Sequence, residues 1–365
     1  MMTRKVLIRS LGLLAAAVLA ACGGGEDAGN QNPKVAYSRL VSFGDSLSDV
    51  GSYKVSGVAA AGGGKFTVNG GDDRIWVERL SQTLGLGAPC AAQTGLNAIQ
   101  AVVGFPPVPA TNHSGCYAYA QGGARVTNPV GPGNALLFNP ADSTSYGNAI
   151  GALTRPLASQ VAGHLAANGG SFGGDELVAV MAGGNDSIVN TAIFGATVAA
   201  GGDPATAAAA ATTAVTAAAT ELVALIKDQI LAKGAQRVIV VNLPDLSQTP
   251  AYAGQDAAVV AVVAGLVQAF NNTVASGVGS DARVLIIDAY TIDRDQNANP
   301  ARYALADVTR PACGETSSLL CSLVTIAANN AGGDFKYADG VHPTPFTHQL
   351  LAQLVAVGMA QRGWL

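Results

Sequence analysis

The sequence predicts an α/β fold organised around a mainly parallel β-sheet. Short apolar runs rich in valine, isoleucine and leucine alternate with longer segments whose apolar residues recur at helical spacing, and this alternation is typical of a doubly wound sheet. Two of the apolar runs end in glycine and small polar residues, where ligands gather in open α/β folds. No repeat, heptad run or linker divides residues 34–365. We therefore expect one domain with loop insertions.

The composition narrows the class of protein. The chain has 365 residues, 49% hydrophobic and 12% charged, with a formal net charge of -4. Such a chain folds as a globular protein and offers no basic face for nucleic acid. We expect no nucleic-acid partner, and a monomer.

The first 33 residues carry an export signal. Three basic residues precede the apolar run 11–21, which is too short to span a membrane as a helix. The run ends in Leu-Ala-Ala and Cys22, which resembles a bacterial lipobox and implies cleavage before Cys22 and its lipidation; an ordinary signal peptide with a chance cysteine is the alternative. We expect a signal peptide at 1–21, a flexible tether at 22–33, and membrane contact only through Cys22. The expected location is the bacterial cell envelope, as an outer-membrane lipoprotein, or outside the cell.

Four further cysteines remain: Cys90, Cys116, Cys313 and Cys321. An even number in an exported chain indicates two disulfides, although four cysteines allow three pairings. We favour Cys90 with Cys116 and Cys313 with Cys321, because each pair flanks a loop-like stretch. A metal site is the rival interpretation, but no CxxC pair or histidine-rich cluster supports one.

The first part of the mature chain holds one predicted strand and one predicted helix. Residues 34–43 form the strand, and residues 74–84 form an amphipathic helix, because their apolar side chains recur on one face. The Gly-rich segment 52–73 is interpreted as a surface loop. Residues 85–116 are also loop-rich, with an extended stretch at 105–109.

The middle of the chain contains a second glycine-rich turn. Residues 117–125 indicate a short strand and then a tight turn at Gly122 and Gly123, where a plain turn is the alternative interpretation. A loop at 127–150 and a helix at 155–167 follow.

A strand that begins at Glu176 repeats the pattern of the first strand, because it ends in Gly-Gly followed by Asn185. Asn185 therefore also lies at the carboxyl end of a strand, although a turn residue in a left-handed conformation is the alternative. The threonines and charged residues of the next helix argue against a membrane span. The remaining predicted elements are helix 204–233, strand 235–244, helix 255–273, strand 282–288 and, after a polar loop at 337–345, helix 346–359.

Ser46 is the candidate nucleophile. It follows the apolar run 40–43, and Gly44 with Asp45 ends that strand. Its hydroxyl therefore lies at the carboxyl end of a strand, where it faces a substrate rather than the core. A helix cap made by Ser46 or Ser48 is the alternative interpretation.

Asp339 and His342 are the candidate partners of that serine. A serine nucleophile needs a base, and the base needs a group that orients it. A turn lets Asp339 accept a hydrogen bond from one imidazole nitrogen of His342 while the other nitrogen faces Ser46. The backbone amides of Ser46 and Gly123, with the side-chain amide of Asn185, are the candidate donors for an oxyanion.

Four ordered blocks resemble those of the GDSL, or SGNH, hydrolase family: Phe43–Asp49, Gly122–Ala124, Gly183–Asp186 and Asp339–Pro343. The similarity spans nearly the whole mature chain. It implies a three-layer α/β/α, flavodoxin-like fold. It also implies that Ser46 is the nucleophile, His342 the base and Asp339 the third triad member, with Gly123 and Asn185 as oxyanion donors.

Two features depart from that family. Many members with this Gly-Gly-Ala block carry an asparagine five residues before the second glycine, where this chain has Ala118. Members of the autotransporter branch continue into a membrane β-barrel, which we do not expect here, because the sequence ends at Leu365 after a predicted helix.

A rival nucleophile, Ser171, lies in the G-x-S-x-G pattern at 169–173. That pattern should follow a strand and open a helix, whereas Ser171 follows a predicted helix and precedes a strand. The histidines His113, His164 and His348 are expected at the surface or in packing. We expect three acids to fix their turns through hydrogen bonds to the backbone: Asp45, Asp49 and Asp186.

The leading hypothesis is an exported, lipid-anchored hydrolase of carboxylic esters that forms an acyl-serine intermediate and uses no metal or organic cofactor. It would be an esterase or lipase acting on short to medium acyl chains of a small-molecule or lipid ester. An O-acetyl esterase acting on polysaccharide and a lysophospholipase stay open, because substrate choice depends on loops 52–73, 85–116 and 127–150. The second hypothesis is a non-catalytic surface lipoprotein that keeps this fold as a binding module.

Overall fold

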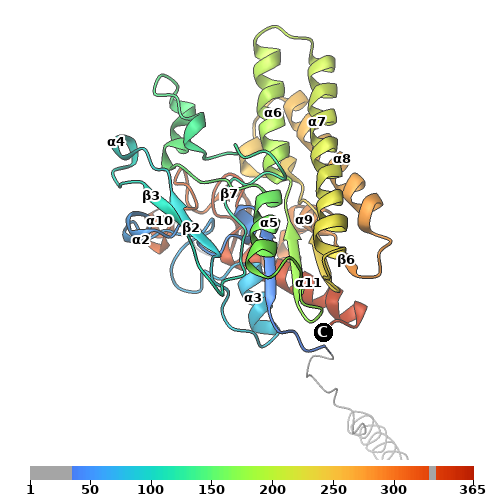
Figure 1. Ribbon diagram of the computed structural model, residues 1–365. Helices are drawn as coiled ribbons and strands as arrows, with labels where there is room; N and C mark the ends of the chain where they lie inside the picture. The colour runs from blue at the N-terminus through green and yellow to red at the C-terminus, as the bar shows by residue number, and fades with distance from the viewer. Residues whose placement is uncertain (1–34, 329–333) are drawn as a thin grey trace, which may run out of the picture. The chain divides into compact units, whose positions relative to one another are not determined.

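Four parallel strands form the central sheet in the computed structural model, which describes residues 35–328 and 334–365 (Figure 1). They lie in the order β1 (Leu40–Gly44), β4 (Leu177–Met181), β5 (Val238–Val241) and β6 (Val284–Ile287). Each of the four strands lies at a predicted strand, but the predicted segments 34–43, 235–244 and 282–288 begin earlier than β1, β5 and β6 do. The mainly parallel sheet is confirmed. The residues Val35–Leu365 form one compact unit. The expected signal peptide at 1–21 and the tether at 22–33, with Cys22, lie outside the described residues.

A fifth segment lies beside β1 and completes the order of the sheet. Ser42 forms a parallel bridge with Ala118, donates its N–H to the carbonyl oxygen of Tyr117 at 3.0 Å, and accepts from the N–H of Tyr119 at 2.8 Å. The strand predicted at 117–125 is therefore reduced to a bridge, because the Gly-Gly turn follows at once. The order across the sheet is then segment 117–119, β1, β4, β5 and β6. When these five are numbered in chain order, this is the order 2-1-3-4-5 of flavodoxin-like folds. The order reverses between β1 and β4, and ligand crevices form at such a reversal.

Two layers of helices cover the sheet and give the three-layer α/β/α architecture. Successive side chains of a strand point to opposite faces, so Val178 and Val180 of β4 join one core while Leu177 and Ala179 join the other. One face is covered by α5 (Leu157–Ala167), α6 (Gly184–Ala199), α7 (Pro204–Ala224) and α8 (Ala257–Val278). The other face is covered by α3 (Trp76–Thr83) and α11 (Pro345–Arg362).

Several elements were not predicted from the sequence. An antiparallel hairpin of β2 (Gln93–Leu96) and β3 (Val108–Asn112) lies inside the segment 85–116 that was expected to be loop-rich. Neither strand alternates apolar and polar residues, and β3 contains a proline, so the usual strand signal is missing. The other elements are the helices α2 (Ser56–Ala60), α4 (Gln100–Val103), α9 (Ala289–Ala298) and α10 (Leu323–Ala328), the strands β7 (Asp307–Pro311) and β8 (Phe335–Tyr337), the 3₁₀ turns η1 (Ser46–Ser48), η2 (Ala135–Leu137), η3 (Ser143–Ile150), η5 (Leu246–Gln248), η6 (Pro250–Tyr252) and η7 (Pro300–Tyr303), and the π-helical end of α7, η4 (Leu225–Leu231).

Two disulfides each close a loop outside the central sheet. Cys90 pairs with Cys116 and Cys313 pairs with Cys321, with Cα–Cα distances of 5.0 and 5.8 Å. These are the two pairs favoured from the sequence. A disulfide stabilises a fold by limiting the unfolded chain, and the longer first loop contributes roughly 3 kcal/mol in that account.

Two described helices, Pro204–Leu231 and Ala257–Val278, are long and apolar enough to cross a membrane by length and composition alone. Both contribute to the core on one face of the sheet, through residues such as Leu222 and Ile226 on the first helix and Leu266 and Phe270 on the second. This packing accounts for part of their apolar composition, since a third of the apolar window of each helix is buried.

Candidate active site

Ser46 lies on the one-turn helix η1 at the carboxyl end of β1. Gly44 has a φ of +154°, and a Cβ there would stand 2.1 Å from the carbonyl oxygen of Met181, so only glycine lets the chain lie this close to β4. Asp45 caps η1, because its Oδ1 accepts a 3.1 Å hydrogen bond from the N–H of Leu47. The cap is thus Asp45, and the hydroxyl of Ser46 faces a cavity.

Ser46, His342 and Asp339 form one hydrogen-bonded chain. Oγ of Ser46 lies 2.8 Å from Nε2 of His342, and Nδ1 of His342 lies 2.8 and 2.9 Å from the two carboxylate oxygens of Asp339. An ionised carboxylate only accepts hydrogen bonds, so Nδ1 carries the proton and Nε2 presents a lone pair to the serine hydroxyl. This is the tautomer that removes a proton from serine.

The carboxylate of Asp339 is held by three backbone donors besides the imidazole. Its Oδ1 accepts from the N–H groups of Val341 and His342 at 3.0 and 2.9 Å, and its Oδ2 accepts from the N–H of Ser318 at 2.9 Å. Burial acts to raise the pKa of Asp339, but the interaction with His342 and these hydrogen bonds outweigh it and hold that pKa below its usual range. Asp339 therefore stays ionised and fixes the imidazole.

The ring of His342 is shielded on one side by Phe66, whose ring centroid is 5.1 Å away. Burial acts to lower the pKa of His342, but the charge and hydrogen bond of Asp339, with a further contribution from the charge of Asp45, raise it above the usual histidine value. A base with a raised pKa accepts the serine proton more readily. Phe66 comes from the glycine-rich segment 52–73, so that segment helps to form the site.

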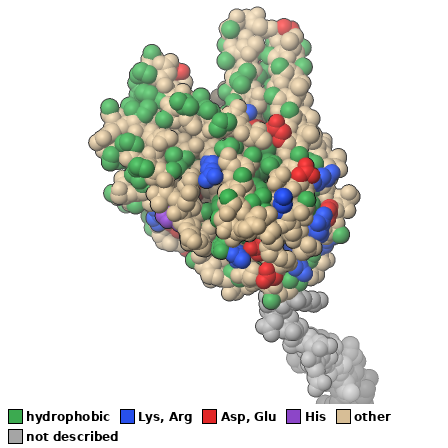
Figure 2. All heavy atoms as spheres, in the orientation of Figure 1, with side chains coloured by type: hydrophobic (Ala, Val, Ile, Leu, Met, Phe, Trp, Pro, Cys, Tyr) green, Lys and Arg blue, Asp and Glu red, His purple; other side chains and the backbone are tan. Residues whose placement is uncertain are grey.

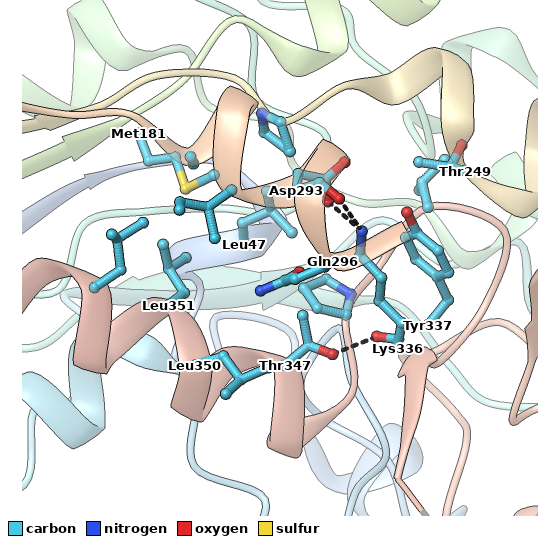
Figure 3. Close-up of a pocket in the computed structure, with 16 residues that line it drawn as sticks. Leu47, Met181, Thr249, Asp293, Gln296, Lys336, Tyr337, Thr347, Leu350 and Leu351 are labelled. Carbon is cyan, nitrogen blue, oxygen red and sulfur yellow. Dashed lines mark hydrogen bonds and ion pairs between the residues drawn. The ribbon is translucent and has the colours of Figure 1, made fainter. Parts of the chain in front are cut away.

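The loop that carries Asp339 and His342 is anchored by a buried lysine. Figure 3 shows Lys336, on β8, with its Nζ 2.7 Å from Oδ1 of Asp293 on α9. The same Nζ lies 2.8 Å from Oδ1 of Asn297, also on α9. The carbonyl oxygen of Lys336 accepts a 2.7 Å hydrogen bond from Oγ1 of Thr347. A small cavity of about 60 Å³ lies beside this pair, behind the loop. These contacts fix the strand from which the loop begins.

Gly123 and Asn185 line the same cavity as Ser46. Gly123 has a φ of +76°, and a Cβ there would stand 2.1 Å from the carbonyl oxygen of Pro132, so the turn requires glycine. Nδ2 of Asn185 donates a 2.8 Å hydrogen bond to the carbonyl oxygen of Ala124. An amide nitrogen carries two hydrogens, so the second stays available to an oxyanion. Asn185 also lies in the first turn of α6, whose N-terminus favours negative charge.

Two acids, Asp49 and Asp186, connect the site loops, whereas Asp45 fixes its own turn. Asp49 accepts from the N–H groups of Gly51 and Ser52 in its own turn, and also from the N–H of Gly122 at 2.9 Å. Asp186 pairs with Arg125 at 2.9 Å and accepts from the N–H of Val126 at 3.0 Å. The local role expected for Asp45 is met at η1. The expected turn-fixing role is also met for Asp49, which in addition holds the distant Gly122. It was wrong for Asp186, whose carboxylate instead binds Arg125 and Val126, near Gly123.

The cavity above Ser46 has a volume of about 320 Å³. Its apolar lining residues include several from loops and one from α6, among them Phe66, Ile150, Ile188, Leu246, Leu319 and Val341. The segments 52–73 and 127–150 contribute to the lining, and 85–116 does not. Three residues near the site were not predicted from the sequence: Ser317, Ser318 and Leu319. The spacing of Cys313 and Cys321 indicated only a closed loop there.

The other sequence candidates lie away from this cavity. Ser171 is exposed between the end of α5 and the start of β4, at the opposite end of the sheet from Ser46. His164 is buried among aromatic rings, and burial lowers its pKa to about 4. His348 is buried on α11 with its pKa lowered to about 3 by burial, and His113 contacts Thr94 beside the hairpin. Within residues 35–328 and 334–365, no group of three or more histidine, cysteine, aspartate or glutamate side chains is placed to hold a metal ion.

Comparisons with solved structures gave matches of low sequence identity. The lipase Lip_vut3 from a goat rumen metagenome is 12% identical, with a TM-score of 0.39 over 88% of this chain and 96% of that one. Phospholipase A1 from Streptomyces albidoflavus NA297 is 15% identical, with a TM-score of 0.43 over 88% of this chain and 98% of that one.

Comparisons of sequence identify the family. A GDSL esterase/lipase, APG, of Arabidopsis thaliana is 27% identical over 150 residues, which are 37% of this chain and 42% of that protein, so the chain spans less than half the length of this curated relative. The model of the family described as GDSL-like Lipase/Acylhydrolase matches residues 40–355. That match runs from the strand before Ser46 to the helix after His342, and the chain therefore belongs to the GDSL-like lipase/acylhydrolase family of ester hydrolases.

Proposed function

We propose that this protein hydrolyses carboxylic esters through an acyl-serine intermediate, with Ser46 as nucleophile. One observation carries the proposal: Oγ of Ser46 is 2.8 Å from Nε2 of His342, whose other ring nitrogen is held by Asp339, at the floor of a largely apolar cavity. Membership of the family supports the same chemistry.

The first half of the reaction acylates the enzyme. Nε2 of His342 takes the proton of the Ser46 hydroxyl while Oγ forms a bond to the ester carbonyl carbon. The resulting oxyanion is stabilised by the backbone N–H groups of Ser46 and Gly123 and by the side-chain N–H of Asn185. The imidazolium, stabilised by Asp339, then gives its proton to the departing alcohol as the carbon–oxygen bond breaks.

The second half of the reaction releases the acid. Water enters in place of the alcohol, His342 removes one of its protons, and the hydroxide oxygen bonds to the acyl carbon. The same three donors hold the second oxyanion. The bond to Oγ then breaks, and the imidazolium returns its proton to Ser46, so each turnover consumes one ester and one water.

We propose an acyl chain of short to medium length as the bound group, which the apolar part of the cavity lining supports. Phe66, Ile188 and Leu319 offer apolar contact to a hydrocarbon chain, and Thr144, Asn148 and Ser317 are polar residues in the same lining. We therefore place an esterase or lipase ahead of an O-acetyl esterase acting on polysaccharide. A lysophospholipase would use the same cavity and differ only in the alcohol that leaves.

An exported location is part of the proposal. The basic and apolar start of the chain and the two disulfides support it. If Cys22 carries a lipid, Cys22→Ser moves the protein from the membrane fraction to the soluble fraction of cells and leaves ester hydrolysis unchanged. A Cys22→Ser variant that still sediments with membranes would exclude lipid anchoring at this residue.

The test of activity is hydrolysis of p-nitrophenyl esters from acetate to palmitate by the protein and by two variants, Ser46→Ala and Ser171→Ala. We expect Ser46→Ala to abolish hydrolysis and Ser171→Ala to leave it unchanged, with the highest kcat/KM at short or medium chain length. Equal inactivity of all three proteins, together with tight binding of a lipid or glycan, would instead support a non-catalytic binding module.

A further inference from the structure

We propose that the mouth of the Ser46 cavity docks on an electrically neutral lipid surface, so that the protein draws its ester directly from aggregated lipid. The inference rests on the proposed ester hydrolysis and adds the physical state of the substrate. Its basis is a pair of projections on either side of the cavity, each with a single charged side chain, which we call the apolar lobe (residues 134–150) and the α6–α7 projection (residues 188–211).

The apolar lobe presents large hydrophobic side chains to solvent. Leu136 is 80% exposed, Tyr146 is 46% exposed, and Leu137 is exposed beside them. Most of the apolar side chains on this protein of comparable size are in its cores. Exposed leucine and tyrosine side chains gathered on one loop indicate a surface that meets another apolar phase.

The lobe holds this conformation through its own polar groups. Oδ1 of Asn134 accepts from the N–H of Leu136 at 3.0 Å, and its Nδ2 donates to Oγ1 of Thr154 at 2.8 Å. Asn148 accepts from the N–H of Gly133 at 2.8 Å and donates to the carbonyl oxygen of Leu137 at 3.3 Å. Because side-chain amides satisfy the backbone inside the lobe, the exposed leucines are displayed on a fixed loop.

The second projection lies across the cavity from the lobe. Figure 1 shows the ends of α6 and α7 extending beyond the sheet, and Figure 2 shows the surface hollowed between them and the lobe, with hydrophobic side chains on both sides. Ile193, on α6, is 56% exposed and lies about 12 Å along the helix axis from Asn185. The two projections thus flank one opening.

The cavity connects the two projections to the nucleophile. Its lining includes Asn148 and Ile150 from the lobe and Asn185 and Ile188 from α6, together with Ser46. An acyl chain that leaves a lipid surface held against both projections therefore passes from one apolar environment into another without crossing bulk water, which the hydrophobic effect favours.

The charges on the two projections indicate which kind of lipid surface they fit. Between Arg125 and Arg155 the only charged residue is Asp142, and between Asp186 and Glu221 it is Asp203. Attraction to anionic lipid needs clusters of lysine and arginine, and neither projection has one. An uncharged lipid surface, such as phosphatidylcholine or triacylglycerol, is the partner that this composition fits.

The rate experiment compares one dissolved substrate with one aggregated substrate. Leu136→Asp/Leu137→Asp and Ile193→Asp are assayed on p-nitrophenyl butyrate in solution and on tributyrin as an emulsion. Val357→Asp is the matched control, because Val357 is 54% exposed on α11, on the other face of the sheet. We expect the Leu136/Leu137 variant to lose about tenfold in emulsion rate, as expected for withdrawing buried leucine surface, with the dissolved-ester rate unchanged.

Three results of this experiment would overturn the docking proposal. They are an unchanged emulsion rate in both projection variants, an equal loss on both substrates, and an equal loss in the Val357→Asp control. If the wild-type protein hydrolyses neither substrate, the proposed ester hydrolysis fails, and docking is then judged from binding alone.

The binding experiment uses Ser46→Ala/Cys22→Ser protein, which neither hydrolyses lipid by the proposed route nor carries an anchor at Cys22. We expect cosedimentation with phosphatidylcholine vesicles that is not strengthened by added phosphatidylglycerol, and its loss in the Leu136→Asp/Leu137→Asp variant. Binding that requires phosphatidylglycerol would contradict a neutral surface. Self-association lost in the same variant, without vesicle binding, would show that the lobe meets a second copy of the chain instead.

Discussion

The backbone N–H of Ser318 donates a 2.9 Å hydrogen bond to Oδ2 of Asp339, the carboxylate that holds His342. Ser318 lies inside the loop that the buried disulfide between Cys313 and Cys321 closes. This loop also supplies Ser317 and Leu319 to the wall of the cavity. The disulfide therefore supports the catalytic geometry as well as the fold.

Removing that disulfide should weaken the orientation of Asp339. We expect Cys313→Ala/Cys321→Ala to lower kcat/KM by about tenfold, because a hydrogen bond to a charged group contributes about 1.5–3 kcal/mol. Cys90→Ala/Cys116→Ala is the matched control, since that disulfide lies beside the hairpin and none of its loop residues line the cavity. Ester hydrolysis measured at a temperature where both variants stay folded checks the difference, and equal losses in the two variants would contradict it.

Asn185→Ala should lower turnover far more than stability. The side-chain amide is one oxyanion donor, so kcat should fall by about a hundredfold to a thousandfold. Loss of its hydrogen bond to Ala124 should cost about 1 kcal/mol in the free energy of unfolding. Steady-state kinetics and urea unfolding measure the two effects. A variant with normal kcat would remove Asn185 from the site.

Asp45→Asn should shift the acid side of the pH–rate profile. The reaction needs neutral His342, so kcat/KM falls as the pH drops through the pKa of His342, which Asp45 helps to raise. Burial raises the pKa of Asp45 itself to about 7, and its charge interacts with that of His342. Asparagine keeps the cap on Leu47 and removes the charge, so the acid limb should move to lower pH. An unchanged limb, or a move to higher pH, would contradict this electrostatic coupling.

Lys336→Met should destabilise the protein strongly. It leaves the buried Asp293 without its cation, and breaking a buried ion pair on one side costs about 3–5 kcal/mol. The double variant Lys336→Met/Asp293→Asn should recover part of this loss, because the uncompensated charge is gone. Urea unfolding of the three proteins measures both changes. Equal stability of Lys336→Met and wild type would show that the pair does not anchor β8.

Most of the sheet could be predicted from the sequence, because its strands are continuous apolar runs that are buried on both faces. The strand before Ser46 and the strand before Asn185 are of this kind, and their glycine endings marked the site. The hairpin β2/β3 could not be predicted in the same way, since its strands are mixed in composition and one contains proline. Helix α6 was missed because its first turn was interpreted only as the polar ending of β4.

The central residues of the candidate site could be predicted for a different reason. Ser46, Asn185 and the Asp339–His342 loop each follow a strand or lie in a polar block with recognisable spacing. Phe66 and Ser318 had no such signal: one is an aromatic residue in a glycine-rich loop, and the other acts through its backbone N–H. Contacts of this kind depend on how distant loops fold together, which residue identity alone does not specify.

The most direct test of the account is covalent labelling by a fluorophosphonate, which reacts with an activated serine hydroxyl. Peptide mass spectrometry of the labelled protein should place the phosphonyl group on Ser46, and His342→Ala should abolish the label. The same digest reports on Ser171, which is exposed but has no place in the triad. Labelling of Ser171 instead, or of Ser46 to the same extent without His342, would contradict a Ser46–His342–Asp339 mechanism.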